Sequence, residues 1–302
     1  MIDILLHVAI LVLLPPLLLG VITKTKARFG GRAGAPLLQP YYDLAKLMRR
    51  GLVLSDTTTW VFRAGPVITL STVLLAGLRI PIGRGGAPVS FTGDLILFAY
   101  LFGLARFFTT SAALDTGSAF EGMGSAREVT FACLSEPALF FAFMVLAKLS
   151  GSLTLTTLLQ GPAQALSADV AAPLVLIAIG LFIVLLAETC RIPVDDPNTH
   201  LELTMIHEAM VLDHSGPLLS VILYAASVKL LVLGTVLLHV IAPFGFEQAW
   251  LDWPLHVAEL LGLAVVIGIV ESIMARLQMR HVPYLLVGAT LFCGFGFILL
   301  IR

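Results

Sequence analysis

The sequence predicts an all-α, polytopic membrane protein with about eight transmembrane helices and an amphipathic cytoplasmic helix in the first loop. Its 302 residues are 58% hydrophobic and only 12% charged, whereas a soluble domain carries about a quarter charged residues. Eight apolar runs approach the length of about 20 residues that a spanning helix needs. One of the loops between them has the periodicity of a surface helix. We expect a single membrane domain over residues 1–302.

The eight apolar runs must be helical, because a backbone without water has to satisfy its own hydrogen bonds. The first run follows Asp3 rather than a basic segment, so we expect a retained helix and not a cleaved signal peptide. Pro15 and Pro16 should kink it. The runs cover residues 3–22, 64–82, 93–112, 129–149, 172–190, 217–240, 256–275 and 283–301.

The distribution of Lys and Arg predicts the orientation, because cytoplasmic loops are enriched in positive charge. Thirteen of the 18 lie in or beside the loops after the first, third, fifth and seventh runs, four lie on the other side, and Lys229 is inside the sixth run. We therefore expect both termini outside, in a bacterial or archaeal cytoplasmic (inner) membrane. The predicted cytoplasmic loops are residues 23–63, 113–128, 191–216 and 276–282.

The first of these loops contains a short helical pattern. Tyr41, Leu44, Ala45 and Met48 recur at the spacing of one helix face, and Pro40 suits a first turn. Two interpretations stay open. The helix is either an interfacial segment held to acidic lipids by basic residues, or it shapes the mouth of a cavity and docks a soluble partner.

The second of these loops, DTGSAFEGMGSARE, is rich in Gly and Ser and lacks the Gly-Lys-Ser/Thr of a P-loop. It predicts a flexible connection that ends at Glu128, where an acid favours the N-terminal dipole of the next helix. Glu136 lies two turns deeper, so capping does not explain it.

Charged residues inside the apolar runs are costly and are usually paired or functional. Lys229, Glu136 and Glu188 are placed deeply enough to serve either in a proton relay or in a structural ion pair. A relay requires groups whose pKa values are brought towards neutrality. Three acids near the ends of spans are expected to be interfacial: Asp94, Glu259 and Glu271.

The segment from residue 188 to residue 216 concentrates acids and histidines. Glu188 and Arg191 are three residues apart and can pair on one helix face. Pro193 should end that helix, and Asp195 begins a run typical of a turn and N-cap. Leu201 to Leu212 can then form a second helix.

No metal or redox site is expected in this chain. His200, His207 and His214 recur every seven residues, but His207-Glu208 is not a zinc motif because Val211 stands where the second His is needed. Histidines in a proton path, or paired with acids, fit better. The three cysteines are far apart, which argues against iron–sulfur clusters and zinc.

Several separated motifs resemble the H-type membrane subunit of respiratory complex I. Residues 188–195, ETCRIPVD, with Glu202-Leu203 and the DHSG at 213–216, resemble the ETNRxPFD … EAEL … EYSG region of that family. The LQPYYDLAKL stretch after the first run is also similar. LDTGSAFEGMGSARE and ESIMARLQMR are closer to the hydrogenase branch, the membrane subunits of formate hydrogenlyase and energy-converting group 4 nickel–iron hydrogenases. The resemblance covers nearly the whole chain.

The resemblance implies a membrane anchor beside a soluble electron-transfer module. Partners would be hydrogenase-like large and small iron–sulfur subunits on the cytoplasmic side, antiporter-like membrane subunits and the lipid bilayer, with no nucleic acid. Iron–sulfur clusters and a nickel–iron centre would belong to those partners. Acids of the quinone-using branch are replaced here by Asn198 and His200, and two extra residues lie near His207-Glu208. These departures argue against a bound quinone.

We therefore predict an energy-coupling, non-catalytic subunit that links electron transfer to proton or sodium translocation. The alternatives are a quinone-binding subunit of a complex I-like oxidoreductase and a purely structural anchor. The predicted proton path comprises Glu128, Glu136, Glu188, Arg191, Asp195, Glu202, Glu208, Asp213 and Lys229. The predicted partner interface or cavity comprises Arg28, Arg32, Gln39, Asp43, Lys46, Asp196, His200 and His207.

Overall fold

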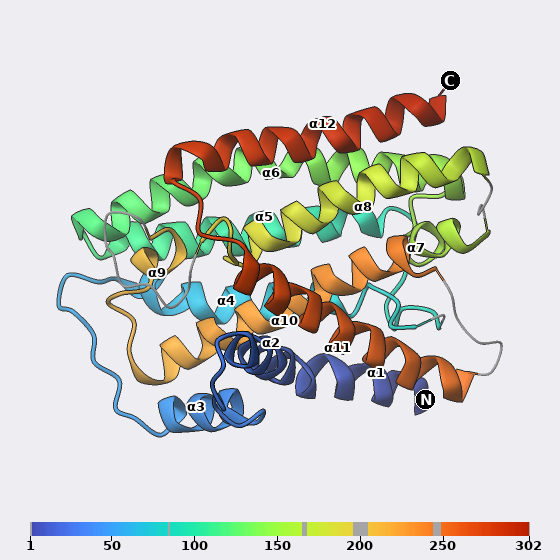
Figure 1. Cartoon of the computed structure of the whole chain (residues 1–302). Coiled ribbons are helices and arrows are strands. Elements are labelled where there is room, and N and C mark those ends of the chain that lie inside the picture. Colours follow the sequence, from blue (N-terminus) through green and yellow to red (C-terminus); the bar gives the residue numbers. More distant parts are fainter. Residues whose placement is uncertain (1, 84, 165–167, 196–204, 244–248, 302) are drawn as a thin grey trace.

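The described part of the chain is all-helical. The computed structural model describes residues 2–83, 85–164, 168–195, 205–243 and 249–301. Most of the helices are long and run side by side, with the short α3 and α9 at one end and α7 at the other (Figure 1). The helices are α1 (Ile2–Leu13), α2 (Pro15–Phe29), α3 (Gln39–Met48), α4 (Trp60–Gly77), α5 (Asp94–Asp115), α6 (Ala119–Ser150), α7 (Leu155–Gln164), α8 (Ala168–Glu188), α9 (His207–Met210), α10 (Gly216–Ile241), α11 (Ala249–Ile273), a 3₁₀ turn (Met279–His281) and α12 (Val282–Ile301).

The prediction of eight spans is confirmed. Within the described residues, seven helices are long and apolar enough to cross a membrane, and the bent pair α1 and α2 forms an eighth candidate span. The bend between α1 and α2 is 45° and falls at Pro15 and Pro16, as expected from two residues without a backbone N–H. Both termini lie at the same end of the bundle, as an even number of spans requires (Figure 1).

Two tyrosines satisfy the carbonyl groups that this bend leaves unpaired. Pro16 cannot donate to the carbonyl of Val12, and the Tyr224 hydroxyl of α10 donates to it instead at 2.7 Å. The next carbonyl, that of Leu13, accepts from the Tyr41 hydroxyl of α3. The break in the first span therefore fixes the positions of both α3 and α10.

Helix α10 is the centre of the molecule. Of its most apolar 18-residue window, 72% is buried, a larger share than in any other straight span of the described chain. It packs against α2, α3, α4 and α8. On one side of the bundle α12 lies along α6 and α8 (Figure 1). The close α8–α12 contact depends on Gly180, where a Cβ would lie 2.3 Å from the Cys293 sulfur.

The predicted flexible connection at 113–128 is wrong, because α6 begins at Ala119 and runs for 32 residues. Its glycines serve close packing rather than flexibility. A Cβ at Gly124 would lie 2.9 Å from the Cβ of Ala209 and 3.0 Å from the carbonyl oxygen of Ile206. Gly124 thus lets α9 rest directly on α6. Glu128 lies well inside α6, so the predicted capping role for this residue is wrong as well.

Two expectations at the other end of the bundle also change. Residues 155–164, expected to be part of a loop, form α7. Asp94 was expected to be interfacial, but it is completely buried and accepts the backbone N–H of Leu155 at 2.6 Å. Asp94 thereby connects the start of α5 to the start of α7.

Helix α3 forms as its periodicity predicted, with Pro40 in its first turn. None of its residues is fully buried. It is held by the Tyr41 contact and by the Ser220 hydroxyl, which donates to the carbonyl of Leu44 at 3.2 Å. Its remaining surface is open to a lipid or protein partner.

Candidate functional site

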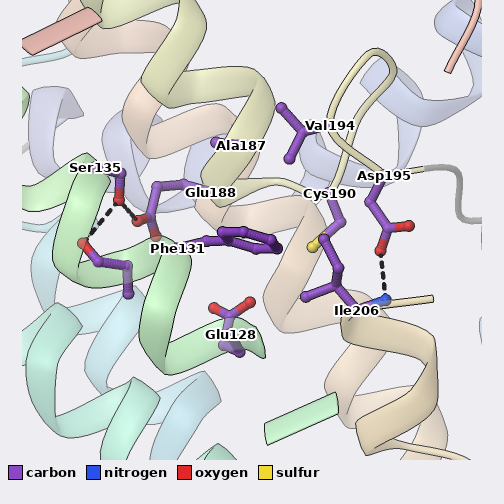
Figure 2. A pocket seen from close by; sticks show the side chains of 10 residues that line it. Glu128, Phe131, Ser135, Ala187, Glu188, Cys190, Val194, Asp195 and Ile206 are labelled. Carbon is purple, nitrogen blue, oxygen red and sulfur yellow. Dashed lines mark hydrogen bonds between the residues drawn. The ribbon is translucent and has the colours of Figure 1, made fainter. Parts of the chain in front are cut away.

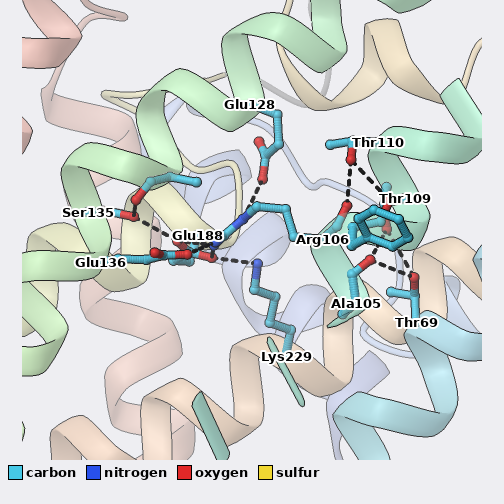
Figure 3. A network of polar contacts seen from close by, with 12 residues as sticks. Thr69, Ala105, Arg106, Thr109, Thr110, Glu128, Ser135, Glu136, Glu188 and Lys229 are labelled. Carbon is cyan, nitrogen blue, oxygen red and sulfur yellow. Dashed lines mark hydrogen bonds and ion pairs between the residues drawn. The ribbon is translucent and has the colours of Figure 1, made fainter. Parts of the chain in front are cut away.

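Arg106 of α5 is the centre of a charged cluster inside the helical bundle. One terminal nitrogen, Nη2, donates to both carboxylate oxygens of Glu188 at 2.8 and 3.0 Å. The other, Nη1, donates to Glu136 of α6. Its Nε lies 3.9 Å from the carboxylate of Glu128, which also belongs to α6. Figure 3 shows these three acids around a single guanidinium.

Glu188, the last residue of α8, has two further partners. The Ser135 hydroxyl donates to its Oε1 at 2.8 Å. The Lys229 ammonium of α10 donates to its Oε2 at 2.7 Å. The side chain of Glu188 is only 10% exposed, and a buried carboxylate with this many donors is held in its charged form. We call the five ionisable residues of this site the Arg106 cluster: Arg106, Glu128, Glu136, Glu188 and Lys229.

The Arg106 cluster joins four helices and is not neutral. Its members come from α5, α6, α8 and α10 (Figure 3). With every group ionised it holds three carboxylates and two cations, and so has a net charge of −1. A net negative cluster in a low-dielectric surrounding favours the uptake of one positive charge. The side chains of Glu136 and Glu128, which are 46% and 19% exposed, are its more accessible acids.

The predicted pairing of Glu188 with Arg191 is wrong. Helix α8 ends at Glu188, and Cys190 adopts a positive φ of 53° that turns the chain away. Arg191 instead lies with its Nη1 3.4 Å from Glu271 of α11, a carboxylate that Lys26 of α2 also contacts at 2.8 Å. The Glu271 side chain, near the end of α11, is 0% exposed and is therefore buried among its protein partners.

Asp195 organises the segment after α8. One of its carboxylate oxygens accepts the backbone N–H groups of Ile206 and His207, both at 3.2 Å. The other accepts from Arg276 at 2.8 Å. Asp195 therefore fixes the entry to α9. The predicted helix over 201–212 is helical in its described part only at His207–Met210.

A small cavity connects the Arg106 cluster to this segment. The space open to the centre of a water molecule is about 20 Å³, which is enough for one water. The carboxylates of Glu128 and Glu188 line it on one side, and Asp195 lines it on the other (Figure 2). The remaining walls are formed by Phe131, Ala132, Ser135, Ala187, Cys190, Val194 and Ile206. Burial raises the pKa of the Cys190 thiol well above its ordinary value, so this side chain adds no charge to the cavity wall.

The two described histidines of the loop are held neutral. Burial lowers the pKa of His214 to about 4, and its ring stacks on Phe62 with 3.9 Å between ring centroids. Burial also lowers the pKa of His207. Asp213 contributes its backbone N–H to the carboxylate of Glu121, 3.1 Å away, while its own side chain is exposed.

The other described residues of the prediction are not members of the Arg106 cluster. Glu208 is part of α9, and Asp196, His200 and Glu202 lie outside the described residues, as does Asn198. Four residues of the first loop have exposed side chains and form a polar surface around α3: Arg28, Arg32, Asp43 and Lys46. Gln39 donates to Asp43 at 2.9 Å within that surface.

Sequence reasoning missed several residues of the site. Arg106 was counted as a loop charge, although its position inside the 93–112 run was the signal that could have found it. Ser135 and Glu121 gave no comparable signal, because a serine and an acid near a helix start are common. Lys26, Glu271 and Arg276 become partners only through tertiary contacts.

Comparison with known proteins identifies the family. The NADH dehydrogenase family profile matches residues 2–302. Formate hydrogenlyase subunit 4 of Escherichia coli K12 is 31% identical over 303 residues, covering 97% of this chain and 94% of that relative. Hydrogenase-4 component C of the same organism is 31% identical over 285 residues, with 91% and 89% covered. The H-type subunit of the NADH-quinone oxidoreductase of Polaromonas naphthalenivorans is 28% identical, and the match covers 64% of this chain and 56% of that relative.

A solved structure has the same fold. The membrane-bound sulfane sulfur reductase, an archaeal respiratory membrane complex, contains a chain that superposes with a TM-score of 0.82 at 21% identity, covering 99% of this chain and 98% of that one. The fold and the charged site thus define a membrane subunit of a respiratory-type complex. The chain belongs to the NADH dehydrogenase family, with relatives in formate hydrogenlyase and hydrogenase-4. The resemblance stated from the motifs is confirmed.

Proposed function

We propose that this chain is the energy-coupling subunit of a formate hydrogenlyase-like or group 4 hydrogenase-like complex. It anchors hydrogenase-like large and small subunits on the cytoplasmic side, and it lies beside antiporter-like membrane subunits. The iron–sulfur and nickel–iron centres belong to the soluble partners. The high coverage of two hydrogenase-type relatives supports this class of complex. The orientation with both termini outside, in a prokaryotic inner membrane, is part of the same proposal.

The observation that carries the proposal is the Arg106 cluster. An arginine bonded to acids from two other helices, with a lysine from a third, forms a set of charges that can exchange partners. Here Arg106 has three carboxylates within reach, and Glu188 is shared by Arg106 and Lys229. Protonation of one acid therefore changes the pairing of the others.

The cavity supplies a starting point for this change. A proton delivered through it reaches Glu128, which lines its wall and lies 3.9 Å from the guanidinium. Neutralising Glu128 leaves Arg106 with Glu188 and Glu136, while Lys229 keeps Glu188. The net charge of the cluster thereby rises from −1 to 0, and the added positive charge lies on α6. Sodium, the alternative ion, would act through the same carboxylates.

The exposure of the Glu136 side chain favours a protein partner on the outer face of α6. Its side chain is 46% exposed in this chain although it lies inside a span. A charged side chain left facing hydrocarbon costs about 2.5–3.5 kcal/mol. A neighbouring membrane subunit that covers this face and supplies a polar group removes that cost. This is where we place an antiporter-like partner that receives the displaced charge.

The test replaces Glu188 by Gln in the assembled complex. We expect Glu188→Gln to abolish ion transport into membrane vesicles while the subunits still assemble, because glutamine keeps the Ser135 contact but not the charge. Asp3→Asn, an exposed change in α1, is the matched control and should leave transport unchanged. Transport is measured with a pH-sensitive dye, and electron transfer is measured in parallel, with and without sodium.

The competing functions give different results in the same experiment. Unchanged transport in Glu188→Gln would contradict the coupling role. If transport were also unchanged in Lys229→Gln, the result would favour the alternative of a purely structural anchor. Inhibition of electron transfer by quinone-site inhibitors would favour the quinone-binding alternative.

A further inference from the structure

A second group of ionisable residues, buried or half-buried, lies on α1, α10 and α11. It contains His7 of α1, His239 near the end of α10, and His256 of α11. His7 and His256 are 1% and 4% exposed. His7 Nε2 donates to the carbonyl of Gly77, 3.0 Å away. None of these histidines takes part in the site described above.

His256 bridges an acid and a hydroxyl group. Its Nδ1 lies 3.4 Å from the carboxylate of Glu259, one helical turn further along α11. Its Nε2 lies 3.4 Å from the hydroxyl oxygen of Thr235 on α10. The charged, imidazolium form of His256 can donate to both partners and is attracted by the carboxylate. A proton on His256 is therefore well accommodated.

Each ring nitrogen of His239 lies near a backbone carbonyl oxygen, which can only accept a hydrogen bond. Its Nδ1 lies 2.8 Å from the carbonyl oxygen of Thr235, and its Nε2 lies 3.3 Å from that of Gly83. A neutral imidazole has a single N–H and can serve only one carbonyl, whereas the imidazolium serves both. The His239 and His256 rings are 5.6 Å apart, so their positive charges repel each other. The pair is therefore suited to one additional proton, not two.

Among the described residues, the other ionisable groups near the pair are Asp252 and His7. Asp252 of α11 is buried next to Gly83, where a Cβ would lie 2.7 Å from its carboxylate. The His7 ring faces the edge of Trp253. Helix α7, which also packs on α10, contains no ionisable side chain. The described acid in direct contact with the pair is Glu259.

We propose that His239, His256 and Glu259 form a proton-binding site, in which the Thr235 hydroxyl orients the His256 ring. Thr235 can do this because its hydroxyl both donates and accepts. It lies six residues beyond Lys229, about 9 Å along α10. The central helix would then have a second titratable site, displaced from Lys229 towards the C-terminal end of α10. Proton binding stands on the contacts described here, and its use in transport rests on the proposed function.

The first experiment measures proton binding directly. The full chain, with ring-labelled histidine, is placed in lipid nanodiscs, and the infrared bands of imidazole and imidazolium are followed from about pH 5 to 8, where histidine titrates. We expect His256→Gln to remove one titrating histidine from the difference spectrum. His281→Gln, an exposed histidine elsewhere, is the control and should remove only a separate, surface-like signal.

Glu259→Gln covers the case in which His256→Gln disturbs folding. In the Glu259→Gln variant, the histidine signal that His256→Gln removes should move to lower pH, because the imidazolium loses its attracting charge. A titration that is identical in the unaltered chain, His256→Gln and Glu259→Gln would overturn the proposal.

The second experiment separates this site from the Arg106 cluster. In vesicles that contain the assembled complex, His256→Gln should reduce proton transport while electron transfer continues. Normal transport in His256→Gln, together with loss of transport in Glu188→Gln, would overturn the transport role of the histidines alone. Normal transport in both variants would overturn the proposed function, although the titration result would stand.

Discussion

Arg106 shows why the identity of a single residue matters in this cluster. A guanidinium has five N–H donors in one plane and keeps its charge at any physiological pH. It can therefore hold Glu188 with one edge and Glu136 with another, as it does here. A lysine ammonium is a compact point charge that cannot span the same three acids. We expect the geometry to depend on arginine, not on positive charge alone.

We predict that Arg106→Gln destabilises the chain by about 3–5 kcal/mol, because it leaves three carboxylates with one cation in a buried site. The double variant Arg106→Gln with Glu188→Gln should recover much of this loss, since one of the stranded charges is removed. Thermal unfolding in detergent measures both. Equal stability of the single and double variants would show that the pair is not coupled.

Arg106→Lys is the complementary change. It keeps the charge, so we expect the complex to assemble while transport falls.

The errors of the sequence interpretation at this scale have one cause. Glu188 and Arg191 have the spacing of a helical pair, but the helix stops between them, and helix ends are the least certain part of any assignment. The true partners of Glu188 are Arg106 and Lys229, which are distant in sequence. Local spacing carries no information on such contacts.

At the scale of elements, the helices that could be predicted from the sequence are those with a long apolar run or a clear helical periodicity. The eight spans and α3 have strong patterns of this kind. The first turns of α6, residues 119–128, do not, because Gly and Ser there read as a flexible loop. In the structure they are helical, and Gly124 there allows the close approach of α9, a tertiary contact that local sequence does not reveal. Helix α7 was missed for a similar reason, since its start depends on the carboxylate of Asp94 in α5.

Gly124→Ala should loosen the α6–α9 contact. Its new Cβ would lie within 3.1 Å of Ala209, Ile206 and Met210, and overpacking of this kind costs about 1–3 kcal/mol. Because Ile206 also lines the cavity, we expect faster modification of the Cys190 thiol, measured by maleimide labelling in a Cys133→Ser background.

Gly122→Ala is the matched control for this change. Its nearest neighbour would be Leu114 at 3.9 Å, an ordinary contact. Labelling of Cys190 should stay slow in that variant. Equal labelling rates in the two variants would contradict the packing role of Gly124.

At the scale of the whole molecule, the orientation combines the fold with the distribution of charge. The fold places both termini at one end and α3 at the other (Figure 1). The excess of Lys and Arg near the α3 end then predicts that this end is cytoplasmic. The number of spans follows from the sequence, but only the assembled helices show which loops share a face.

The orientation can be measured by labelling single cysteines in intact cells. Ile2→Cys and Ile301→Cys should react with a membrane-impermeant maleimide from outside, because the termini are predicted to be external. Asp43→Cys on α3 is exposed and should react only after the cells are made permeable. Labelling of Asp43→Cys in intact cells would reverse the predicted orientation.

The break in the first span also has a mechanical consequence. Consecutive carbonyls, those of Val12 and Leu13, are bonded to Tyr224 of α10 and to Tyr41 of α3. Tyr224 is five residues before Lys229 on the same rigid helix. We therefore expect a force applied to α3 by a docked protein to be passed through this hinge to the helix that carries the lysine. In this view the proline break is a joint between the surface and the charged interior.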